Sequence, residues 1–148
     1  MIEITQCYQL GAQDMFGLEL VKHKRKLTQN FSFCFGHIHD SLGNVPILIQ
    51  KDAFVNGAII RICEAYLHEQ SVEKASSKAL IIDAVFEEIY RRESVNVQSR
   101  IDEWLDQEDK FFLAGYQQAN DYNNHSLKLK WLSDYAQQNF EPENNLML

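Results

Sequence analysis

Two histidines have the spacing in this sequence that most suggests chemistry. His37 and His39 lie in an alternating apolar and polar run, and residues two apart on a strand project from the same face. Imidazole nitrogens bind zinc and related metals, but a complete site needs a third and usually a fourth ligand. Asp40 is adjacent, whereas nothing in the spacing brings another histidine near. The pair is therefore a candidate metal site, and its alternative is two exposed imidazoles beside a turn.

A basic run at 22–26, with the sequence Lys-His-Lys-Arg-Lys, is the second candidate. Concentrated positive charge can contact phosphates or an acidic protein surface. No aromatic residue interrupts the run to stack on bases, and no nucleic-acid-binding module is recognisable. Docking of an acidic partner, nucleic-acid binding and a simple solvated connection all remain open. The candidate partner-binding residues are Lys22, Lys24, Arg25 and Lys26.

Aromatic residues in the polar C-terminal third are a further candidate for partner binding. Interfaces favour such residues because a large ring buries area while its polar atom keeps a hydrogen bond. Packing in the core is the alternative use. The residues concerned are Tyr116, Tyr122, Trp131 and Tyr135.

Other catalytic patterns are missing from the sequence. The isolated glycines form neither GxGxxG nor GxxxxGK[ST], and there is no GxSxG elbow, so we expect no nucleotide cofactor of the usual kinds. The three cysteines, Cys7, Cys34 and Cys63, are far apart and lie in apolar stripes, where a thiol stays protonated and inert. Carboxylates cluster at 87–88, 102–103 and 106–109, where we expect them to lie on solvent-exposed helix faces and ends and to keep the protein surface soluble.

The composition bounds the class of protein. The chain has 148 residues and a net charge of −7, with 14 Lys and Arg against 21 Asp and Glu. This length fits one domain with a single core. The acidic balance disfavours a protein whose whole surface binds the phosphates of a nucleic acid. We see no membrane-spanning stretch and no signal peptide, which predicts a cytoplasmic protein.

The hydrophobic period changes near residue 50. Residues 2–8 and 31–39 alternate at period two, and the second run leads through a glycine-containing loop into the branched segment 45–49, which predicts a hairpin. Residues 12–27 fit a helix or a strand equally well. From Asp52, a plausible N-cap, apolar residues recur at helical spacing, with further helix starts predicted at Ser71, Ser99, Asp109 and Ser126.

The sequence thus predicts a single α+β domain that is mainly helical. A small N-terminal antiparallel sheet or hairpin, in a strand-rich part at 1–50, would pack on a C-terminal bundle of four or five helices at 52–141, followed by a loose tail at 143–148. The function we expect is non-enzymatic protein binding by a small adaptor or inhibitor, such as a toxin-neutralising immunity protein or an effector chaperone. A metal-dependent hydrolase or metal-binding domain using His37 and His39, and nucleic-acid binding through 22–26, are the alternatives. A homodimer is also compatible with the wide apolar stripe at 71–92.

Overall fold

Helices are the only regular secondary structure in the part of the chain that the structure describes. This computed structural model describes residues 2–36, 38–39, 44–121 and 129–140, with side chains in the first helix described from Gly17 onward. The elements in chain order are α1 (Ile2–Phe35), α2 (Ile47–Gln50), α3 (Ala53–Glu69), α4 (Ala75–Tyr90), the short 3-10 helix η1 (Arg91–Glu93), α5 (Ser94–Asp106), α6 (Lys110–Asp121) and α7 (Lys130–Phe140).

The prediction of an α+β fold with an N-terminal sheet or hairpin is therefore wrong. No strand occurs among the described residues, and the segments 2–8 and 31–35 both belong to α1. The segment 47–50 is a single helical turn, while the predicted loop at 40–44 lies outside the described residues except for Asn44, which is in a bend. A continuous helix satisfies its own backbone hydrogen bonds, whereas an isolated hairpin leaves many of them to water.

The phenylalanines of α1 show why the alternating pattern misled. Leu27, Phe31 and Cys34 are fully buried and lie three or four residues apart, which is the spacing of one helical face. Phe33, which period two groups with Phe31 and Phe35, is 76% exposed. The apparent strand pattern arose because Phe31 and Phe35 are also one helical turn apart.

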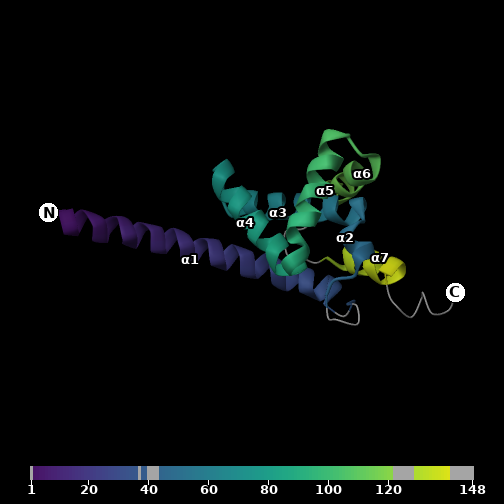
Figure 1. Ribbon diagram of the computed structural model, residues 1–148, viewed down its shortest axis with the longest axis horizontal. Coiled ribbons are helices and arrows are strands. Elements are labelled where there is room, and N and C mark those ends of the chain that lie inside the picture. Colours follow the sequence, from purple (N-terminus) through teal and green to yellow (C-terminus); the bar gives the residue numbers. More distant parts are fainter. Residues whose placement is uncertain (1, 37, 40–43, 122–128, 141–148) are drawn as a thin grey trace.

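Helix α1 extends well beyond the other helices at its N-terminal end (Figure 1). Figure 1 shows its N-terminal part projecting away from the other helices, and its C-terminal part lying beneath them. The C-terminal part contacts α4 and α7. Residues 12–27, which the sequence left ambiguous, are thus helical and include the point where α1 enters the bundle.

Helices α3 and α6 form the tightest pair in the bundle. A Cβ atom at Gly57 would overlap the backbone carbonyl oxygen of Phe112, and one at Gly115 would overlap that of Phe54. The two backbones can approach so closely only because both positions lack a side chain. Phe112 is 1% exposed and fills the core beside this contact.

The start of α3 matches its prediction. Asp52 is the N-cap, and its carboxylate accepts a hydrogen bond from the Val55 amide at 2.8 Å. Asn56, fully buried, donates to the carbonyl oxygen of Ile49 and accepts from the Tyr90 hydroxyl at 2.6 Å, which ties α3 to α2 and α4. These bonds satisfy the polar groups that the helix start brings into the core.

Of the other predicted helix starts, one is confirmed, two are wrong and one lies outside the described residues. Asp109 caps α6, since its carboxylate accepts from the amides of Phe111 and Phe112. Ser71 is not a cap, because α4 begins at Ala75 after a loop in which Ser71 has a φ of 61°. Ser99 lies inside α5, which begins at Ser94. Ser126 and the predicted tail at 143–148 lie outside the described residues.

We expect Asp52 to be replaceable by asparagine but not by alanine. Burial raises the pKa of the Asp52 carboxyl, so its charged form is disfavoured in the folded state. Its contribution to stability is therefore greatest below the ordinary pKa of 3.8 and declines as the pH rises through the raised value. Asn keeps the cap without the charge, whereas Asp52→Ala should cost about 1 kcal/mol.

Urea unfolding at pH 4 and pH 7 checks this expectation. The stability of Asp52→Asn relative to the wild type should rise with pH, while Asp52→Ala should be less stable than Asp52→Asn at both values. A relative stability of Asp52→Asn that falls as the pH rises would show that the carboxylate charge stabilises the fold.

Candidate functional site

The histidine pair loses the geometric basis of its prediction. His39 is exposed, and its Nδ1 lies 3.1 Å from the carbonyl oxygen of Gly36, while His37 and Asp40 lie outside the described residues. The strand that would align the two imidazoles is replaced by the end of α1 and the segment after it. Among the residues that the structure describes, no three His, Cys, Asp or Glu side chains gather as metal ligands would.

The basic run at 22–26 is divided by the helix into buried and exposed positions. His23 is 5% exposed and its Nδ1 lies 3.2 Å from the Tyr66 hydroxyl, so it belongs to the core. Lys24 pairs with Glu88 of α4 at 3.4 Å. Lys22, Arg25 and Lys26 are exposed, and none of them pairs with a carboxylate in the described part of the chain.

These three cations share their side of α1 with exposed apolar side chains. Leu18, one turn before Lys22, is 71% exposed, and Val21, next to Lys22, is 46% exposed. Phe33, about two turns after Arg25, is 76% exposed. Helical spacing places 18, 22, 25, 29 and 33 in one line along the helix. We call this surface the outer α1 face, defined by Leu18, Val21, Lys22, Arg25, Lys26 and Phe33.

The inner side of the same helix holds the outer α1 face in place. Leu27, Phe31 and Cys34 are completely buried, and they anchor the helix against α4 and α7. A rigid support of this kind lets a surface bind without first having to order itself. The outer α1 face is therefore a preformed strip of apolar and basic groups.

The C-terminal aromatic residues are engaged within the molecule. The Tyr116 hydroxyl donates to Glu64 at 2.5 Å, and Arg61 lies over the Tyr116 ring. The Tyr135 ring packs at a tilt against the Phe54 ring, with ring centroids 4.7 Å apart. Trp131 packs partly buried against the core, and Tyr122 lies outside the described residues. Their prediction as partner-binding residues stays a prediction, whereas Phe33 is an exposed aromatic residue that the strand interpretation assigned to a strand face.

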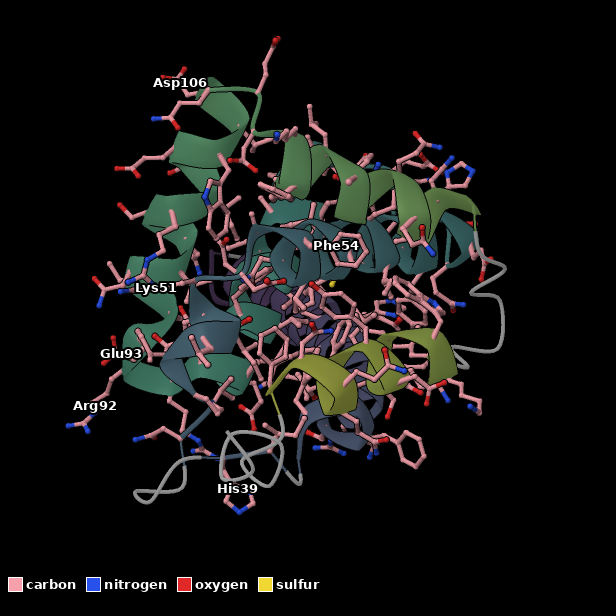
Figure 2. All side chains as sticks on the ribbon, turned by 90° about the vertical axis from the view of Figure 1, so that its right-hand side faces the viewer. His39, Lys51, Phe54, Arg92, Glu93 and Asp106 are labelled. Carbon is pink, nitrogen blue, oxygen red and sulfur yellow. The ribbon has the colours of Figure 1, made fainter. Side chains whose placement is uncertain are left out.

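A second polar surface lies at the far end of α5. Asp102, Glu103, Leu105 and Asp106 line an open hollow of about 530 Å³. Figure 2 shows Asp106 and His39 at opposite ends of the molecule. No positively charged side chain lines this hollow. Its carboxylates are exposed to solvent at the end of α5, as the sequence predicts.

The described cysteines have the inert character expected of core thiols. Burial raises the pKa of Cys34 to about 12 and raises that of Cys63 further, and both side chains are fully buried. A thiolate is the reactive form, so neither thiol is a nucleophile near neutral pH.

Thiol titration provides the corresponding measurement. In a Cys7→Ser variant at neutral pH, we expect a disulfide reagent to leave Cys34 and Cys63 unmodified for as long as the protein is folded, and to modify both at once in denaturant. Rapid labelling of either residue in the folded protein would contradict the burial described above.

The fold and the outer α1 face define a helical bundle with one long projecting helix. No protein-family model matches the chain, and neither the curated proteins nor the solved structures include a significant match. Within the described residues, no helix combines the length and the apolar character that crossing a membrane requires.

Proposed function

We propose that this chain is a protein-binding module that docks an acidic protein partner on the outer α1 face. The observation that carries the proposal is the set of three exposed cations, with no carboxylate partner among the described residues, between exposed apolar side chains on one side of a well-anchored helix. Such a module acts by holding or covering its partner, as adaptors and inhibitors do. Neutralising a toxin or escorting an effector is the kind of role that fits.

Charge favours an acidic partner and fixes where it can bind. The whole chain has a net charge of −7, so an acidic surface is repelled by most of the molecule. Lys22, Arg25 and Lys26 form a local exception to this balance. Complementary charges raise the association rate and set the orientation of the complex.

The apolar side chains of the outer α1 face offer surface whose burial against a partner is favourable, which the cations do not. Leu18 and Phe33 are each more than two-thirds exposed, and burying such groups against a partner is favourable. Aromatic residues and arginine are enriched where binding energy concentrates in interfaces. A partner with a mixed acidic and apolar strip therefore fits this face.

Protein fits the outer α1 face better than nucleic acid does. A nucleic-acid backbone would meet the three cations, but it offers no complement to Leu18 and Val21 on the same strip. The acidic remainder of the chain would also repel a polyanion that extends beyond the helix.

A pair of charge reversals tests the proposal. The Lys22→Glu, Arg25→Glu variant reverses two cations of the outer α1 face. The matched control, Lys51→Glu with Arg92→Glu, makes the same change in net charge at two exposed cations elsewhere, which point outward in Figure 2. The full-length wild type and both variants serve as bait in nuclease-treated lysate of the source cells, after circular dichroism confirms that each is folded.

We expect one acidic protein to bind the wild type and the control, and to bind the outer-face reversal at least about tenfold more weakly, because like charges then oppose each other. Equal binding to all three baits would overturn the proposal. Binding that occurs only in a parallel lysate without nuclease treatment would show that the partner is a nucleic acid, and recovery of this chain alone would show that the partner is a second copy; either result also overturns it.

A further inference from the structure

A second exposed surface that combines charged and apolar side chains lies on α4 and α5, which pack directly against each other. Helical spacing places 80, 83 and 87 in one line along α4, and 102 and 106 one turn apart on α5. Three residues of this surface also line the open hollow at the end of α5. We call it the α4–α5 face, defined by the exposed residues Leu80, Asp83, Glu87, Asp102, Leu105 and Asp106.

The carboxylates of the α4–α5 face repel one another. Burial raises the pKa of Asp83, and the nearby carboxylates of Glu87 and Asp102 raise it further. In the part of the chain that the structure describes, no lysine or arginine pairs with any of the four carboxylates. A positive group that approaches from outside would therefore relieve this repulsion.

Apolar side chains lie beside these carboxylates. Leu80 and Leu105 are each 53% exposed, and burying them against another surface is favourable. A complementary surface thus combines cations with apolar side chains. The outer α1 face has this combination, because its three cations lie between exposed apolar side chains.

The two complementary faces cannot meet within one molecule. The side of α1 that packs toward α4 is the buried one, with Leu27 and Phe31, so the outer α1 face points away from α4. Figure 1 shows α5 rising away from α1. The two faces can therefore come together only when they belong to two copies of the chain.

The net charge of the chain restricts how two copies can approach. Two chains with a net charge of −7 repel each other in most orientations. An orientation that places the local cations of one copy against the carboxylates of the other is the exception. Charge therefore selects one arrangement among many.

We propose that a second copy of this chain docks its outer α1 face on the α4–α5 face. The cations Lys22, Arg25 and Lys26 of one copy oppose the carboxylates of the other, and the exposed apolar side chains of both faces are buried between them. Because the contact joins two different surfaces, each copy keeps one free face, so association continues into chains or closes into rings.

This contact would also regulate docking of the acidic protein, a consequence that rests on the proposed function. The acidic protein and the α4–α5 face of a second copy compete for the same three cations. Self-association therefore covers the outer α1 face until the acidic protein displaces the second copy.

Sedimentation velocity of the purified full chain tests the proposal without any lysate. The weight-average sedimentation coefficient is measured from micromolar to near-millimolar protein, at low and at high salt. The Lys22→Glu, Arg25→Glu variant reverses the outer α1 face. The control, Lys51→Glu with Arg92→Glu, makes the same change in net charge at exposed residues of neither face.

A charge swap makes the test specific to the two faces. Asp83→Lys with Asp102→Lys reverses the α4–α5 face at two exposed positions, and circular dichroism confirms that each variant is folded. The milder change, Asp83→Asn with Asp102→Asn, should weaken association in the same direction. Each reversed variant is measured alone, and the two are then mixed in equal amounts.

We expect the sedimentation coefficient of the wild type and the control to rise with protein concentration at low salt, and high salt to suppress the rise because it screens the charges. Either reversal alone should weaken association at least about tenfold. The mixture should associate again, because each reversed face then meets a face of opposite charge.

The proposal is overturned if the wild type stays monomeric, if either reversed variant associates as the wild type does, or if the mixture stays monomeric. A monomeric wild type would leave capture of an acidic protein from lysate unaffected, so this proposal and the proposed function fail separately.

Discussion

Gly115→Ala should destabilise the protein by about 3 kcal/mol, although alanine is the better helix former. The added Cβ would overlap the carbonyl oxygen of Phe54, and backbone atoms of α3 cannot rotate away as a flexible side chain could. The helices must therefore move apart, which loosens the contact around Phe112. The larger Gly115→Leu change should leave the bundle unfolded.

Gly17→Ala is the matched control for this prediction. Gly17 lies within α1, and an added Cβ there would meet nothing within 4 Å. The substitution should stabilise the protein by about 0.5–1 kcal/mol through helix propensity alone. Urea unfolding of both variants gives the comparison, and equal stability changes at the two glycines would contradict the close contact of α3 with α6.

Phe31→Ala should cost about 3–5 kcal/mol, whereas Phe33→Ala should change stability by less than about 0.5 kcal/mol. Phe31 is completely buried among the core residues of the bundle, while Phe33, two positions away, is 76% exposed. Removing the Phe31 ring leaves a cavity in the core. Removing the Phe33 ring takes away apolar surface that is already in contact with water in the folded protein.

This pair also distinguishes the helix from the strand that the sequence predicts. In a strand, Phe31 and Phe33 project from the same face, so their replacement would have similar effects. Denaturant unfolding monitored by circular dichroism measures both variants against the wild type. A cost at Phe33 that matches the cost at Phe31 would contradict α1 as described.

The helical part of the fold was predictable where capping and periodicity agree. Asp52 precedes a run of apolar residues at three- and four-residue spacing, and α3 starts there with the expected cap. Asp109 precedes α6 in the same way. Both are local signals, since a cap bonds to amides within three residues of it.

Helix α1 was not predictable from the same kind of signal. Its buried face includes the polar residue His23, which interrupts the apolar helical pattern. Its exposed face includes Phe33, which together with Phe31 and Phe35 gives the alternation typical of a strand. The choice between periods depends on what packs against the segment, and α4 and α7 come from much later in the chain. Contacts with these later helices therefore determine that the segment is a helix, which the local alternation of apolar and polar residues could not show.

The basic run at 22–26 shows how far a site can be predicted. Its charge was visible in the sequence, and three of its four lysine and arginine residues belong to the outer α1 face. The loss of Lys24 to an ion pair with Glu88 was not visible, because it depends on the position of α4.

The most direct test of the docking proposal is position-specific photo-crosslinking in lysate of the source cells. A benzoylphenylalanine replaces Phe33 on the outer α1 face, and in a matched chain it replaces Phe111, which is 60% exposed on α6. In both views α6 lies away from the C-terminal end of α1 (Figures 1 and 2). We predict that an acidic protein is crosslinked at position 33 and not at position 111, and that the Lys22→Glu, Arg25→Glu changes abolish the adduct. A partner crosslinked at 111 alone, or equally at both positions, would contradict the account.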